Sequence, residues 1–110
     1  MRNALALLLV LCIPSFSARA QVVGDADAGK TKNSMCIGCH GIPMYKTAFP
    51  AVYSVPMIAG QSSQYIVKAL QEYREDARSH PTMRAIAKGL SDQDMADVAA
   101  YYSNGGKAAK

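Results

Sequence analysis

The chain has 110 residues, half of them apolar, and its 12 lysines and arginines against eight aspartates and glutamates give a formal charge of +4. The basic residues are scattered and no nucleic-acid-binding motif is present, which argues against a nucleic-acid-binding protein. A chain of this length forms one domain, and such a small core usually needs a disulfide, a metal or a cofactor.

The first 20 residues have the three segments of a secretory signal peptide. A positively charged start at Met1–Asn3 precedes ten apolar residues from Ala4 to Ile13, and a tail of small residues ends at Ala20. Ten apolar residues are too few to span a bilayer, which needs about 20. We therefore expect cleavage before Gln21, export to the bacterial periplasm, and a domain over residues 21–110 that does not stay in the membrane.

The first part of this domain predicts a helix followed by a long loop. Asp25 or Asp27 can cap a helix that runs toward Cys36, because an aspartate side chain accepts the free N–H groups of a first turn. Residues 41–60 contain prolines and glycines without a sustained hydrophobic period. A loop of this length in a compact domain must be ordered by something, and a prosthetic group packed against it would do so.

An amphipathic helix is predicted to begin at Ser62 or Ser63. Its apolar residues recur at three- and four-residue spacing, as one face of a helix requires: Tyr65, Ile66, Ala69, Leu70 and Tyr73. The pattern fades by Arg78, and Pro81 marks the break.

The remaining residues predict a turn and a last helix. Residues 82–88 are expected to form a short turn that ends at Gly89. Ser91 then begins a helix, with Asp94 three residues later as its capping partner. The buried stripe of this helix comprises Met95, Val98, Ala99 and Tyr102. With no convincing strand or repeat, the sequence predicts an all-α, loop-rich domain.

Residues 36–40 read Cys-Ile-Gly-Cys-His, the C-x-x-C-H signature of haem attachment. Two thiols at this spacing can form thioethers with the two vinyl groups on one edge of the porphyrin. The next residue then lies under the ring, where the imidazole Nε2 of His40 can bind the iron. The motif predicts one covalent haem c, with thioethers to Cys36 and Cys39.

Other uses of two close cysteines agree less well with the sequence. A thioredoxin-like redox pair needs a βαβ context, which is absent from the predicted elements. A zinc site would need further ligands, but Cys36 and Cys39 are the only cysteines after residue 20 and His80 is the only other histidine. A pair this close also cannot link distant segments, which is how exported chains usually employ cysteines.

The residues alone leave the second axial ligand open. A His and Met pair is usual in electron carriers, because the thioether stabilises ferrous iron and raises the reduction potential. Met83 follows the amphipathic helix and Pro81, which stiffens its segment. Met57 in the long loop and His80 are the alternatives. The positions of the other methionines after residue 20 argue against them: Met35, Met44 and Met95.

The chain resembles the class I cytochromes c, and among them the small bacterial cytochromes of the c4 and c5 type. The resemblance covers nearly all of residues 21–110 and is carried by these segments: Gly24 to Lys32, Cys36 to Gly41, Val55 to Gln61, Tyr65 to Tyr73, Met83 to Ala87 and Leu90 to Tyr102. In that family the methionine before a short Ala-rich turn is the axial ligand, which implies Met83. The resemblance also implies that the Pro56 carbonyl accepts the Nδ1–H of His40, which fixes the orientation of the imidazole.

The resemblance implies a cytochrome c fold in which the N- and C-terminal helices cross. The haem would lie between the Cys36–Gly60 loop and the loop of Met83, in a pocket expected to include Pro56, Ile58, Tyr65, Ile66, Leu70 and Tyr73. Arg78 and Arg84 are candidates for contacts with the haem propionates or for surface charges.

One segment departs from the family. Relatives usually have a smaller, glycine-rich stretch where this chain has Ile42–Ser54, and they often carry Asn where this chain has Met57. The segment contributes three aromatic residues, Tyr45, Phe49 and Tyr53. We expect these rings either to contact redox partners near the haem edge or to fold back onto the haem.

These features predict a soluble, monomeric electron carrier rather than an enzyme, since His40 and Met83 would leave the iron no open position. Its partners are expected to be redox proteins that bind weakly and briefly. Residues 21–110 hold ten basic and eight acidic residues, so a charge of +2 gives little steering. Two alternatives remain: a haem ligand sensor or small peroxidase with a weak Met83 bond, and an electron-input subunit of an enzyme complex.

Overall fold

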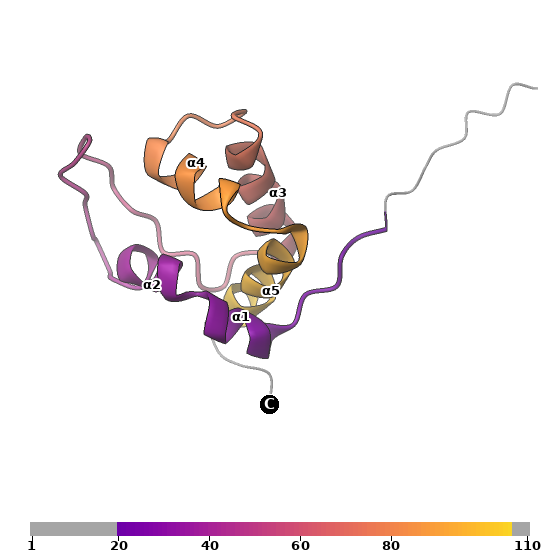
Figure 1. The fold of residues 1–110 in the computed structure, drawn as a ribbon. Coiled ribbons are helices and arrows are strands. Elements are labelled where there is room, and N and C mark those ends of the chain that lie inside the picture. The colour runs from indigo at the N-terminus through magenta and orange to yellow at the C-terminus, as the bar shows by residue number, and fades with distance from the viewer. Residues whose placement is uncertain (1–19, 107–110) are drawn as a thin grey trace, which may run out of the picture.

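The computed structural model describes residues 20–106, which form five helices (Figure 1). They are α1 (Ala26–Lys32), α2 (Ser34–His40), α3 (Ser63–Arg74), α4 (Pro81–Lys88) and α5 (Asp92–Ser103). The only strand-like pairing in this part of the chain is an isolated bridge between Lys46 and Ser54. The domain is all-α, as predicted, and none of the described helices is long and apolar enough to cross a membrane. Apart from Ala20, the predicted signal segment lies outside the described residues.

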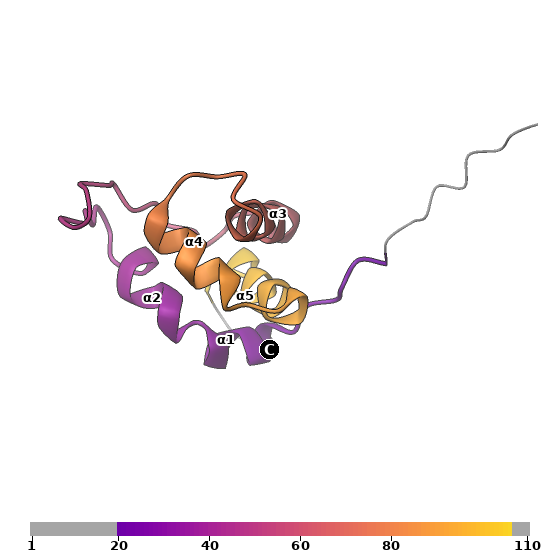
Figure 2. The ribbon, with the colours of Figure 1, turned by 45° about the horizontal axis from the view of Figure 1, so that its top comes forward.

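The first and last helices pack across each other, as expected, while α3 packs against both α4 and α5 (Figures 1 and 2). Two glycines allow the first of these contacts. A Cβ atom on Gly24 would collide with the carbonyl oxygen of Ala96, and one on Gly29 would collide with that of Asp97. The backbones of α1 and α5 therefore approach so closely that only residues without a side chain fit there.

A buried carboxylate also joins α1 to α5. Asp97 is 2% exposed and accepts hydrogen bonds from the Nζ of Lys32 (2.6 Å), the Nε2 of Gln93 (2.8 Å) and the backbone N–H of Asp25 (2.9 Å). Burial alone would raise the pKa of Asp97, but the hydrogen bonds from Lys32, Asp25 and Gln93 outweigh it and lower the pKa. The carboxylate therefore stays ionised and binds both helices.

The helix predicted to run from Asp25 toward the cysteines is in fact two helices. Asp25 does cap α1 by accepting two backbone N–H groups of the first turn, but α1 ends at Lys32. Asn33 follows, buried, and its side-chain amide donates to the carbonyl of Lys30 at 3.1 Å. Asparagine competes with helix formation through such local hydrogen bonds. The C-x-x-C-H motif consequently lies in its own helix, α2.

Residues 41–60 form the long irregular segment that the sequence predicts, reaching outward from α2 before it returns to α3 (Figure 1). Its outer part folds back on itself. The Thr47 N–H donates to the Tyr53 carbonyl at 2.9 Å, and the Thr47 hydroxyl accepts the Tyr53 N–H at 3.1 Å. Phe49 near the turn is 88% exposed, whereas Tyr45 and Tyr53 are half-buried. The three aromatic rings of this segment therefore have different surroundings.

The prediction of a short turn over residues 82–88 is wrong, because Pro81–Lys88 forms helix α4. Proline is well suited to the first helical position, where its missing N–H is not needed. His80 caps the helix and Gly89 ends it. The proline that breaks the pattern after α3 thus begins another helix, and Met83 lies in the first turn of α4 rather than in a loop.

The last helix agrees with its prediction. Ser91 and Asp94 form a capping box, in which the Asp94 N–H donates to the Ser91 hydroxyl at 3.1 Å and the Ser91 N–H donates to the Asp94 carboxylate at 3.0 Å. The predicted stripe is buried and joins residues of α3 and α4 in one apolar cluster: Ile66, Leu70, Ala87, Met95, Val98, Ala99, Tyr101 and Tyr102. The core thus lies among α3, α4 and α5.

Candidate functional site

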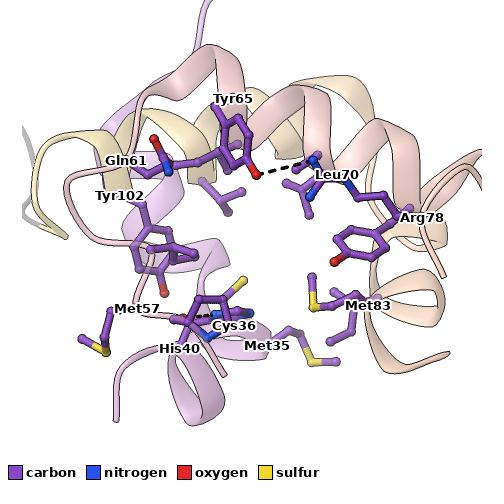
Figure 3. Close-up of a pocket in the computed structure, with 17 residues that line it drawn as sticks. Met35, Cys36, His40, Met57, Gln61, Tyr65, Leu70, Arg78, Met83 and Tyr102 are labelled. Carbon is purple, nitrogen blue, oxygen red and sulfur yellow. Dashed lines mark hydrogen bonds between the residues drawn. The ribbon is translucent and has the colours of Figure 1, made fainter. Parts of the chain in front are cut away.

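A cavity of about 240 Å³ opens among α2, residues 56–61, α3, α4 and α5 (Figure 3). All six residues expected in the haem pocket line it: Pro56, Ile58, Tyr65, Ile66, Leu70 and Tyr73. The segment after the motif supplies one wall and the inner face of α3 supplies another. Most of the wall is apolar, so the cavity suits a large apolar group with few polar contacts.

His40 ends α2 and is held at the cavity by one hydrogen bond. Its Nδ1 lies 2.6 Å from the carbonyl oxygen of Pro56. A carbonyl oxygen only accepts, so Nδ1 must carry the proton and Nε2 of the neutral ring keeps a free lone pair. A histidine that binds a metal is usually oriented in this way by a partner of its other nitrogen. The structure thus contains the His40–Pro56 contact that the family resemblance implies.

The two cysteines of α2 are free thiols, and both are half-buried. Cys36 lines the cavity, while Cys39, one turn further along the helix, is not among the lining residues. Burial raises the pKa of the Cys36 thiol, opposite to the lowered pKa of a redox-active thiol. Within residues 20–106, no group of three or more His, Cys, Asp or Glu side chains is placed to hold a metal ion. Neither alternative use of the cysteines therefore finds support.

Three methionines line the cavity, and they differ in position. Met83 enters from the first turn of α4, half-buried, and lies on a different side of the cavity from His40 (Figure 3). Met57 is 50% exposed and its side chain points away from the centre. Met35, which the sequence argument set aside, also lines the cavity and is 66% exposed. His80 is not among the lining residues, so Met83 is placed best as a partner for His40.

Arg78 lies at the edge of the cavity among aromatic rings. Its Nε donates to the Glu72 carboxylate at 2.6 Å and its Nη2 donates to the Tyr65 hydroxyl at 3.4 Å. The guanidinium also lies over the rings of Tyr65 and Tyr73, at 5.5 and 5.6 Å from their centroids. Arg84, the other candidate, instead pairs with Asp76 at 2.6 Å on an exposed face of α4. Only Arg78 is positioned to contact a group in the cavity.

Tyr102 is a cavity residue that the sequence argument assigned only to the core. Its hydroxyl is buried and has no hydrogen-bond partner among the described residues. Burial, with smaller effects of Cys36 and Tyr101, raises the pKa of Tyr102 to about 12, so the hydroxyl stays protonated. Other lining residues that the sequence analysis did not assign to the pocket are Gln61, Ala69, Ile86 and Val98. Ile86 would have been found by reading residues 82–88 as a helix, because it lies one turn after Met83.

The residues around this cavity fit a covalently attached haem. They supply a free thiol at the wall and a second one on the same helix, an imidazole with Nε2 unused, and a thioether from another side. The apolar wall would exclude water from the porphyrin, and the Tyr102 hydroxyl at this wall is buried without a hydrogen-bond partner among the described residues. Arg78, the charged residue among those that line the cavity, could pair with a propionate.

Comparison with known proteins points to the same cofactor. A model of the family described as cytochrome c matches residues 26–105. Cytochrome c-554(548) of Halomonas halodenitrificans is 40% identical over 84 residues, which cover 74% of this chain and 96% of that protein. Cytochrome c4 of Thiocapsa roseopersicina is 40% identical over 87 residues, which cover 78% of this chain and 43% of that protein.

A solved structure of cytochrome c4 from Acidithiobacillus ferrooxidans shares the fold. It superposes with a TM-score of 0.61 at 27% identity, over 83% of this chain and 55% of the other. The chain spans about half the length of the cytochromes c4 that it matches, but nearly the full length of cytochrome c-554(548). The matched region includes all five helices and every residue that lines the cavity.

Proposed function

Because the chain belongs to the cytochrome c family, which implies a covalent haem c, we propose that it carries single electrons between redox proteins. The iron of the bound haem supplies the redox chemistry, since it can gain or lose one electron. The protein has to hold that group in one geometry, keep water away and leave an edge accessible to partners. The half-open cavity suits these three tasks.

The proposed roles follow from the positions of the side chains. Cys36 and Cys39 would hold the porphyrin through thioethers, and His40 would bind the iron through Nε2. The hydrogen bond of 2.6 Å from its Nδ1 to Pro56 orients the ring and makes Nε2 a stronger donor. Met83, from the first turn of α4, would supply the second protein ligand of the iron. Tyr65, Leu70, Tyr73, Pro56 and Ile58 form the apolar wall of the pocket.

The His40–Pro56 contact carries the proposal best, together with Met83 on another side of the same cavity. Two protein ligands leave no coordination position for a substrate, which supports electron transfer over catalysis. A haem ligand sensor or small peroxidase would need Met83 to leave the iron readily. An electron-input subunit would use the same site but would remain bound to an enzyme, which gel filtration of the native protein distinguishes from a free monomer.

Replacement of the two competing methionines tests this site. Met83→Ala should abolish the weak ferric absorption band that marks methionine–iron ligation and should lower the reduction potential markedly, because an axial thioether favours ferrous iron. Met57→Leu is the matched control and should keep both. Loss of the band in Met57→Leu instead would assign the ligand to Met57, and a wild-type chain without the band would favour the sensor or peroxidase.

We also propose that the chain works in the periplasm, on the basis of the signal segment predicted at residues 1–20. N-terminal sequencing of the protein purified from the periplasmic fraction should begin at Gln21. A mature chain that retains residues 1–20 would contradict cleavage and would favour an anchored form.

Partner binding is proposed to be brief and to involve the exposed part of the segment Ile42–Ser54. Of its aromatic residues, Phe49 is 88% exposed and available, whereas Tyr53 packs its ring against His80 at 4.1 Å between centroids. A carrier must release its partner quickly, so its interface should be small, below about 1,200 Å² in total. With a charge of only +2 in residues 21–110, rates of electron transfer should change modestly between low and high salt. A steep salt dependence would instead indicate docking through a charged patch.

A further inference from the structure

His80, outside the cavity, is connected to Met83 by a direct hydrogen bond. It is the N-cap of α4, with φ −146° and ψ 110°, and its Nδ1 accepts the backbone N–H of Met83 at 3.3 Å. Its carbonyl also accepts the N–H of Arg84 at 2.9 Å. A single residue thus closes the first turn of α4 around the proposed axial ligand.

The imidazole of His80 is also packed between two other segments. Its ring centroid lies 4.1 Å from that of Tyr53 in the long loop and 6.4 Å from that of Tyr73 on α3, the latter edge-on at 81°. The backbone of Tyr53 is held in turn by two hydrogen bonds with Thr47, one with its N–H and one with its hydroxyl. The side chain that caps α4 is therefore itself held in place by the loop and by α3.

We propose that His80 is a positioning residue for Met83, acting through the cap of α4 and through its contact with Tyr53. The proposal rests on Met83 being the axial ligand, as argued above. When the cap is made, the first turn of α4 is closed and the Met83 side chain is presented to the cavity. When it is lost, the first turn can open and Met83 leaves the iron more often.

Apart from the packing of α4 against α3 and the core, the contacts of this helix are ion pairs at the surface. The ion pairs of Asp76 with Arg84 (2.6 Å) and Lys88 (3.2 Å) attach the exposed side of the helix, and all three side chains are at least 40% exposed. Exposed ion pairs contribute little to stability because water and salt screen them. Among the described residues, His80 is the one that bonds the backbone of Met83 from outside the helix.

Binding of imidazole to the ferric protein measures how often Met83 leaves the iron. The added ligand needs the open form, so its apparent affinity rises in proportion to the population of that form. His80→Ala should raise this affinity about fivefold, which corresponds to about 1 kcal/mol, the usual contribution of a helix cap. His80→Asn, which keeps a cap acceptor, should return the affinity to within about twofold of wild type.

Ser91→Ala is the matched control for a general loss of stability. It removes the cap of α5, where the Ser91 hydroxyl accepts the Asp94 N–H at 3.1 Å, and α5 carries no proposed iron ligand. It should lower the free energy of unfolding about as much as His80→Ala while leaving the imidazole affinity unchanged. An equal rise in Ser91→Ala would show that His80 has only a general structural role, and the proposal would be overturned.

Substitution of Tyr53 separates the stacking contact from the cap. Tyr53→Phe keeps the ring and should match wild type, whereas Tyr53→Ala removes it and should raise the imidazole affinity about twofold or threefold, as expected for an aromatic pair. A ferric band of methionine ligation in wild type with no change in His80→Ala would overturn the proposal for His80 alone. Absence of that band in wild type would overturn both Met83 as the ligand and this inference.

Discussion

The contact between α1 and α5 and the wall of the cavity are built in different ways. At the helix contact, backbone meets backbone at Gly24 and Gly29, and Asp97 has all its partners within the chain. Around the cavity, large side chains are not covered by the rest of the chain: Met35 is 66% exposed, Met57 50% and Tyr65 49%. The first region is complete by itself, whereas the second is completed by a cofactor.

This difference shows where the stability of a small haem protein comes from. The helix contact gains from close packing and from a buried carboxylate whose hydrogen-bond donors all belong to the chain itself. The cavity side has apolar groups that cannot bury themselves against one another, so its share of the folding free energy comes with the haem. Substitutions in the two regions should therefore have different consequences: those at the haem anchors should release the cofactor, and those at the helix contact should lower the free energy of unfolding.

The largest effect is expected from removing the anchors of the cofactor. Cys36→Ser with Cys39→Ser should give a chain that releases its haem into acidic acetone, whereas wild type should retain it. Without the covalent group, we expect no cooperative unfolding transition by circular dichroism, because a chain this small relies on its cofactor for a core. A cooperative transition in the haem-free variant would show that the α1–α5 region folds independently.

A smaller but still large effect is expected at the helix contact. Gly29→Ala would place its Cβ against the carbonyl oxygen of Asp97, so α1 and α5 must separate, at a cost of about 3 kcal/mol. Gly89→Ala is the control, because its Cβ would lie 3.5 Å from the Ile86 oxygen, an ordinary contact. Denaturant unfolding measures both, and the haem should remain attached in each. Equal stability of the two variants would contradict the close approach.

The next largest effect on the free energy of unfolding is expected at the buried carboxylate of Asp97. Asp97→Asn should cost about 2 kcal/mol at pH 7, because it removes the charge that pairs with Lys32 in a buried site. Asp92→Asn, which breaks a more exposed pair with Arg74, should cost less than about 1 kcal/mol.

The same variant predicts a pH dependence. The pKa of Asp97 is lowered in the folded state, so its contribution is fully present above the unfolded pKa of about 3.9 and is lost as the pH falls through the folded value. The stability gap between wild type and Asp97→Asn should therefore shrink below about pH 4. Urea titrations at a series of pH values measure the gap, and a constant gap would mean that Asp97 is not ionised in the fold.

The smallest effect on stability is expected at the exposed tip of the loop. Phe49→Ala should change the free energy of unfolding by less than about 0.5 kcal/mol, since the ring is 88% exposed. Tyr53→Ala in the same segment is the comparison and should cost more, because its ring packs on His80. Similar losses in both would indicate that Phe49 is buried by the bound cofactor.

The sequence was sufficient for those parts of the molecule that depend on local patterns. The capping box at Ser91, the stripe of α5, the start of α3 and the C-x-x-C-H motif were all found from spacing alone. The break at Asn33 was missed, since its cause is a side-chain hydrogen bond whose effect on chain direction depends on tertiary packing. Helix α4 was missed because Pro81 was interpreted only as the end of the preceding helix, whereas proline is also common at the first position of a helix.

The cavity was predicted only in part. The pocket residues on α3 and after the motif were identified, because the spacing of α3 and the family resemblance both indicate them. Tyr102 belongs to the core cluster and also lines the cavity. A hydrophobic stripe shows only that a residue is buried, so it cannot indicate whether that residue also faces a cavity. The proposed role of His80 depends on its contact with Tyr53, which lies 27 positions earlier in the chain. No local sequence pattern indicates such a contact.

The contact between α1 and α5 also determines when the fold can be completed. These helices lie at opposite ends of the described chain, and Asp25 bonds Asp97 across 72 residues. During synthesis from the N-terminus, α2 with its two thiols emerges well before α5. Contacts between distant residues form late, because the chain entropy of closing a long loop must be overcome first. The two thiols of α2 are thus exposed for haem attachment during the interval before α5 is available to close the domain.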